Sequence, residues 1–169
     1  MTSPPSWALA LTFWLHLFAT VTWVGSLAAV SLLVLPAMKR SLDSETQLVF
    51  IEAIQKRLEP IAWFCISLLL VTGLFQMSVN PHYDGFLSTS TQWSLAILIK
   101  HLLGIILVIF SAIQTWEVIP AIRRAIIRSK KSKNADELES LRRREVILLR
   151  LNFGLSLLIL LATAFARAS

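Results

Sequence analysis

The sequence predicts an all-α integral membrane protein, a four-helix bundle with up-down topology, and three observations lead to this prediction. Of the 169 residues, 56% are hydrophobic and only 15% are charged, whereas a soluble domain carries about 25% charged residues. Four apolar runs are long enough to cross a bilayer core of about 30 Å: 7–35, 61–79, 93–119 and 146–166. The connections between them are short, which favours antiparallel neighbours. Residues 1–169 are therefore expected to form one polytopic membrane domain.

Proline and polar residues mark the ends of the predicted spans. Residues 3–6, Ser-Pro-Pro-Ser, suit the start of the first helix. Pro36 is expected to end that helix, Pro81 follows the second, and Pro120 is expected to end the third. Segment 42–58 has apolar residues at a spacing near 3.6. This spacing predicts an amphipathic helix, either on the membrane surface or continuous with the second span.

The positive charges are distributed unevenly along the chain. Nine of the 16 Lys and Arg residues lie between positions 123 and 144, and segments 1–6 and 80–92 contain none. The positive-inside rule then places both termini and the 80–92 connection outside a plasma membrane, with the basic loop 120–145 in the cytoplasm. A basic loop in this position is expected to contact anionic lipid. The net charge of +6 therefore does not indicate a nucleic-acid-binding protein.

Ionisable residues inside the apolar runs are the candidate functional residues. His16 lies in the first run, and Lys100 and His101 lie in the third. A charged side chain at the centre of a spanning helix costs about 2.5–3.5 kcal/mol on insertion scales, so it usually marks a function. At about 1.5 Å per residue, His16 lies roughly 13 Å inward from Trp7. Lys100 and His101 lie about 10–12 Å inward from Trp93 by the same measure.

The first and third helices of an up-down bundle face each other diagonally across the core. Because His16 and His101 lie at similar depth in the outer half, they are expected to meet there. Two such imidazoles suit the axial positions of haem b or two ligand positions of a copper ion. Met77 and His82, at the outer end of the second run or just beyond it, are further candidate metal ligands. Lys100 is a candidate partner for an anionic ligand group such as a haem propionate.

Each candidate residue also has a structural interpretation. The two membrane histidines can simply form hydrogen bonds across the bundle, as other polar residues do. Lys100 can extend its ammonium group to the outer interface, and His82 can be an ordinary surface residue. Glu117 and Arg150 lie at comparable depth near the cytoplasmic end, where they are expected to form a structural ion pair.

Several short motifs resemble the copper resistance protein D (CopD) family, and the resemblance extends over nearly the whole chain. The similar segments are Trp14-Leu15-His16-Leu17, Thr22-Trp23-Val24-Gly25-Ser26-Leu27, Thr72-Gly73-Leu74, Leu98-Ile99-Lys100 and Pro120-Ala121. This resemblance implies a membrane protein that handles copper at the inner membrane.

A second set of residues is similar to the HemJ family of membrane protoporphyrinogen oxidases. These are His16 with Trp23, Lys56-Arg57-Leu58 and Lys100. The first-helix histidine and third-helix lysine of that family are associated with haem binding and activity, roles that the resemblance assigns to His16 and Lys100. The chain departs from the pattern in the fourth run, where Phe153-Gly154 replaces an acidic residue and a proline.

Taken together, these observations predict a CopD-like protein that binds or transports copper at His16 and His101. The first alternative is a haem b protein of electron transfer or porphyrin oxidation, with the same histidines as axial ligands and Lys100 at a propionate. The second alternative is a structural subunit of a larger membrane complex. Besides the lipid bilayer, the first two functions imply a redox or metal-delivery partner protein.

Overall fold

The computed structural model describes residues 4–81, 83, 85, 87–129 and 135–168, and this part of the chain contains helices and turns but no strand. The helices are α1 (Ser6–Ala28), α2 (Leu35–Ser41), α3 (Ser44–Ser78), α4 (Gln92–Ile113), α5 (Ile119–Ser129) and α6 (Ala135–Ala168). Two π-helical segments, Ala29–Val34 and Gln114–Val118, join α1 to α2 and α4 to α5 without a break.

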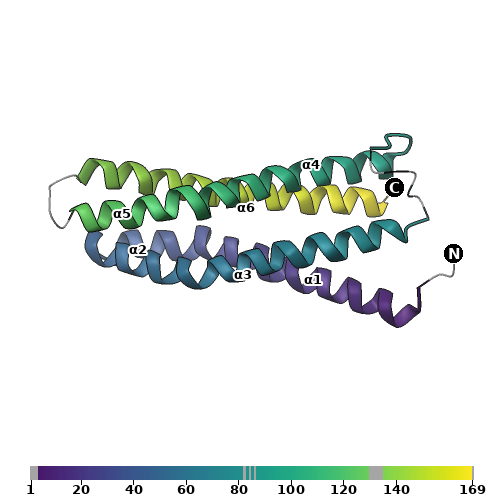
Figure 1. The fold of residues 1–169 in the computed structure, drawn as a ribbon, viewed down its shortest axis with the longest axis horizontal. Helices are drawn as coiled ribbons and strands as arrows, with labels where there is room; N and C mark the ends of the chain where they lie inside the picture. Colours follow the sequence, from purple (N-terminus) through teal and green to yellow (C-terminus); the bar gives the residue numbers. More distant parts are fainter. Residues whose placement is uncertain (1–3, 82, 84, 86, 130–134, 169) are drawn as a thin grey trace.

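The helices form a four-rod bundle of the predicted up-down type. Four described stretches are long and apolar enough to cross a membrane: Ser6–Ser41, Val49–Ser78, Gln92–Ile126 and Glu137–Arg167. The most extensive packing joins α1 to α3 and α4 to α6, and α1 also contacts α6. Figure 1 shows the start of α1, the end of α6 and the α3–α4 connection at one end of the bundle, here called the termini end. The α2–α3 turn and the α5–α6 connection lie at the other, called the loop end.

The rods continue through prolines that the sequence pattern treats as helix ends. Pro36 and Pro120 each lie two residues beyond the last residue of a π-helical segment, and Pro60 lies inside α3. A proline cannot donate to the carbonyl four residues earlier, and its ring clashes with that carbonyl. The wider π turn relieves both problems because its hydrogen bonds span five residues. The third rod therefore extends to Ser129 rather than ending near Pro120. Segment 42–58 belongs largely to α3, the second of the two predicted alternatives.

The bundle exposes apolar side chains on its outer surface, as a membrane protein requires, and packs another set in its interior. Large apolar side chains such as Trp14, Leu33, Val71 and Phe165 are exposed along the rods, which is the expected surface for contact with lipid tails. In the interior, a mid-bundle cluster of apolar residues lies near the middle of the rods: Ala19, Trp23, Cys65 and Leu107.

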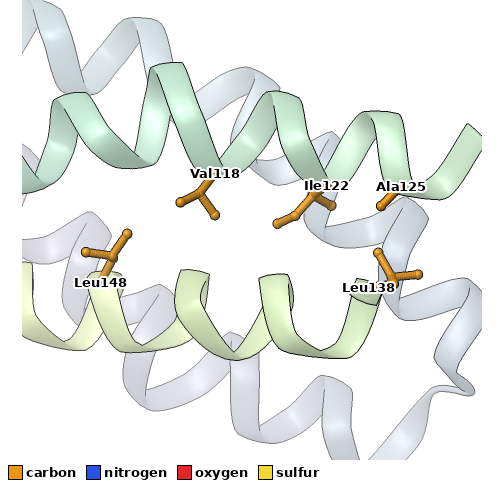
Figure 2. Packing of buried hydrophobic residues seen from close by; sticks show 5 residues of the cluster. All are labelled: Val118, Ile122, Ala125, Leu138 and Leu148. Carbon is orange, nitrogen blue, oxygen red and sulfur yellow. The ribbon is translucent and has the colours of Figure 1, made fainter. Parts of the chain in front are cut away.

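A second apolar cluster, the loop-end cluster, joins α5 to α6. Figure 2 shows its side chains pointing toward one another between the two helices: Val118, Ile122, Ala125, Leu138 and Leu148. Buried polar residues lie on both sides of the mid-bundle cluster along the rods, with Thr72 toward the termini end and Asn152 and Glu145 toward the loop end.

Candidate functional site

His16 lies in the half of the bundle nearer the termini end and is held by α3. Its Nδ1 atom is 2.8 Å from the Thr72 hydroxyl oxygen. The same hydroxyl lies 2.6 Å from the Leu68 carbonyl one turn earlier in α3 and donates to it. Because that bond uses the only hydroxyl proton of Thr72, the oxygen must accept from His16.

This hydrogen bond fixes the tautomer of the imidazole ring, that is, which of its two nitrogens carries the proton. Nδ1 of His16 carries the proton and donates to Thr72, so the neutral ring holds its lone pair on Nε2. Metal-binding histidines usually have this arrangement, in which a hydrogen bond at one nitrogen orients the ring and the other nitrogen is the ligand. His16 is therefore oriented as a single-nitrogen donor.

Small and polar residues of α3 let the ring lie close to that helix. A Cβ atom added at Gly73 would lie 3.5 Å from Cε1 of His16, an ordinary van der Waals contact, so the ring lies beside Gly73. One turn nearer the termini end, Gln76 donates from Nε2 to the Thr12 carbonyl of α1 over 3.3 Å. These contacts bind α1 to α3 around the histidine.

Lys100 of α4 approaches the same histidine from the other side of the bundle. Its ammonium group is partly buried and lies close enough to His16 to act on the ring electrostatically. Since α1 and α3 provide His16 and Thr72, three of the four rods contribute to this site. We refer to His16, Thr72 and Lys100 as the histidine site.

His101, the neighbour of Lys100, has a different setting. Its Nδ1 donates to the Ile97 carbonyl of its own helix over 2.7 Å. This bond directs the ring along α4 and places the proton on Nδ1, as in His16. The joint binding of one ion or one haem by His16 and His101 remains a prediction.

The other candidate metal ligands are Met77 and His82, and neither has a contact with His16 that the structure describes. Met77 is buried, with 9% of its surface exposed, and lies four residues beyond Gly73. Residues four apart share a helix face, so Met77 lies on the face of α3 that carries the His16 contact, one turn nearer the termini end. His82 lies outside the described residues. Among those residues there is no group of three or more His, Cys, Asp or Glu side chains placed to hold a metal ion.

Glu117 has a partner other than the one expected from sequence. Its Oε1 lies 2.8 Å from Nη1 of Arg144, and both side chains are about half exposed. Arg150, the expected partner, lies six residues further along α6 with an exposed side chain. An exposed pair of this kind contributes about 0–1 kcal/mol, so Glu117 and Arg144 form a surface contact at the loop end.

Sequence reasoning missed two residues that the structure makes prominent. No local pattern in the sequence marks Thr72 as the hydrogen-bond partner of His16. Glu145 is almost fully buried, at 2% exposure, although it follows a run of three arginines that suggests a solvated surface. A signal was present, because Glu145 continues the core-facing stripe formed by Leu138, Leu148 and Asn152 at helical spacing.

Comparison with known proteins places this bundle in a family. The family model for copper resistance protein D matches residues 52–166. The chain belongs to the CopD family. The match covers most of α3, all of α4 and α5 and nearly all of α6, and therefore includes Thr72 and Lys100 but not His16. No curated protein and no solved structure matches the chain.

Membership of the CopD family relates this multi-pass membrane protein to copper resistance. The family match identifies a CopD-type protein, and the four apolar rods agree with a multi-pass membrane protein.

Proposed function

We propose that this CopD-family protein binds copper within the bilayer, for storage or for passage across it, at the histidine site. The observation that carries the proposal is the Thr72 hydrogen bond, which orients the Nε2 lone pair of His16 as a ligand. Copper is the substrate of this site and not a resident cofactor.

The donor atoms near the site fit copper in chemistry. Imidazole nitrogen binds copper in both oxidation states, and thioether sulfur favours Cu(I). His16 offers the first, and Met77 lies on the adjoining turn of α3 to offer the second. His101 is the proposed second imidazole. It reaches the ion only if its Nε2 turns toward α1, since its Nδ1 is bonded to Ile97.

Lys100 sets a condition on copper binding. Its ammonium group is close enough to His16 for electrostatic interaction, and a cation in a low-dielectric interior repels a second cation strongly. A copper ion at His16 therefore requires Lys100 to give up its proton, or an anion to accompany the metal. The same lysine favours a ligand that carries a negative charge.

That charge supports haem b as a second candidate ligand. A propionate at Lys100 with the iron at His16 would satisfy both residues, and the haem iron would then supply one-electron chemistry. In this proposal His16 holds the iron, Thr72 orients the imidazole and Lys100 neutralises the propionate. His101 would be the second axial ligand.

The test is performed on the full chain purified in detergent. Copper binding is measured as the metal-to-protein ratio after loading with Cu(I), and haem binding as a Soret band. The copper proposal expects a stoichiometric ratio without a Soret band, and a loss of at least about tenfold in affinity in His16→Ala. A wild-type ratio and affinity in both His16→Ala and His101→Ala would refute the site and leave a structural subunit as the function.

Lys100→Leu separates the two ligands. Leucine keeps an apolar side chain at this position but removes the charge, and it adds no atom that can bind a metal. Copper retention should stay the same or increase, because the repulsion is gone. Haem retention should decrease, because a propionate loses its partner. Decreased copper retention in this variant would contradict a copper site with a repelling lysine.

Localisation and partners follow from the charge pattern rather than from the site. We propose a plasma-membrane location with both termini outside, since the basic residues gather at the loop end. The basic loop end would contact anionic lipid, and a copper-delivery or redox protein would exchange its cargo at the termini end, where the histidine site lies nearer the surface.

A further inference from the structure

A cavity lined mainly by apolar side chains, with several polar side chains among them, lies on the opposite side of the mid-bundle cluster from the histidine site. Its volume is about 100 Å³, and its lining comes from all four rods. Trp23 of the mid-bundle cluster forms one of its walls, and Gln55 and Glu145 line it toward the loop end. We call it the inner cavity.

Four side-chain atoms in the wall of the inner cavity lack hydrogen-bond partners among the described residues. The unpaired donors are Nε1 of Trp23 and Nε2 of Gln55, and the unpaired acceptors are Oε1 of Glu145 and Oδ1 of Asn152. Three of these residues are more than nine-tenths buried: Trp23 at 7% exposure, Glu145 at 2% and Asn152 at 2%. Buried polar groups in native proteins are almost always paired, so the four atoms indicate a missing partner.

The set of unpaired atoms identifies the chemistry of that partner. A metal cation does not suit the site because the N–H groups of Trp23 and Gln55 would point their protons at it. An anion does not suit it because the carboxylate of Glu145 would repel it. Water both donates and accepts, and buried water typically bonds about three polar groups that would otherwise be unpaired. Since one water takes about 30 Å³ of liquid volume, the inner cavity has room for a small cluster.

The backbone is irregular at the same place. Both π-helical segments contribute to the wall, through Val30 and Val34 of one and Gln114 of the other. The residues on either side of Pro60 also line it. π turns occur frequently at functional sites. Irregular backbone at membrane depth is tolerated where it lines a hydrated space.

Glu145 also lines a second, smaller cavity toward the loop end. This space of about 20 Å³ is shared by Gln55 and Glu145 with Glu52, Arg123 and Arg142. Glu52 and Arg123 form an ion pair of 3.5 Å between α3 and α5, and both are substantially exposed. Glu145 therefore stands between the inner cavity and groups that meet solvent.

We propose that the inner cavity holds a cluster of ordered waters and that Glu145 exchanges protons between this cluster and the loop end. A hydronium ion on the side of the smaller cavity gives its proton to the Glu145 carboxylate and becomes water. The resulting carboxylic acid returns the proton to a water of the inner cavity, so atoms and charge balance and no electron is transferred. The charged groups that face Glu145 are Arg142 on its own helix, Glu52 and Glu59 on α3, and Arg123 on α5.

The first experiment is infrared spectroscopy of the full chain in lipid nanodiscs across a pH series. A buried carboxylic acid gives a C=O band that shifts in D₂O when water reaches the group. We expect such a band to titrate with pH, to disappear in Glu145→Gln and to persist in Glu117→Gln, the surface glutamate that serves as the matched control. A band that is absent at every pH, or is insensitive to D₂O, would overturn the proposal.

The second experiment needs no variant and detects the water directly. Hydroxyl radicals generated by an X-ray pulse oxidise side chains beside bound water. We expect Trp23, in the wall of the inner cavity, to be oxidised more than Trp14, which faces lipid tails. Equal, low oxidation of the two tryptophans would mean a dry cavity and would refute the proposal. Copper loading at the histidine site should be unchanged in Glu145→Gln, so a failure of the copper proposal is recognised separately.

Discussion

At the scale of single residues, the hydroxyl of Thr72 controls the chemistry of His16. It accepts from the imidazole and donates to its own helix, so it fixes both the tautomer and the direction of the ring. In the proposed ligand site, the ammonium group of Lys100 would favour a ligand that carries a negative charge. The three side chains, from three rods, together set the tautomer of His16, the direction of its ring and the charge beside it.

Thr72→Val tests this control, because valine keeps the shape of threonine but cannot accept a hydrogen bond. The Nδ1–H group of His16 would be left unpaired, which costs about 1–3 kcal/mol. Ligand affinity at His16 should decrease by about 10- to 100-fold, measured by the same copper and haem titrations.

The matched control is Thr20→Val. The Thr20 hydroxyl donates to the backbone carbonyl of His16 over 2.8 Å and leaves the ring untouched. This variant should keep the affinity of the wild type. An equal loss in both variants would mean that Thr72 acts only through helix stability.

At the scale of secondary-structure elements, α5 and α6 are joined by the loop-end cluster (Figure 2). Its residue Ile122 is followed by Arg123 and Arg124, which places this contact near the aqueous end of the bundle. There the hydrophobic effect stabilises packing as it does in a soluble protein, whereas it gives no force between helices in the lipid core.

Ile122→Ala should therefore destabilise the protein by about 2–5 kcal/mol. The control is Ile109→Ala, the same change on the same rod at a residue that is 50% exposed and faces lipid. Its effect should be much smaller. Chemical denaturation of both variants in detergent measures the difference, and equal destabilisation would contradict the role of the loop-end cluster.

The elements also show what a pattern of prolines cannot predict. The spans, their order and the continuation of α3 through segment 42–58 were accessible from apolar runs and spacing. The continuation of the third rod through Pro120 was not, because it depends on a π turn that leaves no signature in a single sequence. Glu145 was missed for a related reason: its charged neighbours suggested a surface, and only tertiary packing shows which side of α6 is buried.

At the scale of the whole molecule, the termini end and the loop end differ in charge. Nine of the 16 lysines and arginines lie between positions 123 and 144, and Lys39 and Arg40 lie in α2 close to the loop end. By the positive-inside rule, we propose that the loop end lies in the cytoplasm.

Cysteine labelling in intact cells tests this orientation. In a Cys65→Ser background, Thr89→Cys introduces a thiol at the termini end and Ser140→Cys one at the loop end, both at exposed positions. An impermeant maleimide should label the first in intact cells and the second only after permeabilisation. The opposite pattern would invert the topology.

The division of the bundle into two helix pairs has a mechanical consequence. The most extensive packing joins α1 to α3 and α4 to α6, and His16 belongs to the first pair while Lys100 belongs to the second. A ligand bound by both residues would link the two helix pairs. Loading and release would then be inseparable from a change in the spacing of the halves, so occupancy of the site should be readable as a distance between spin labels placed on α3 and α4.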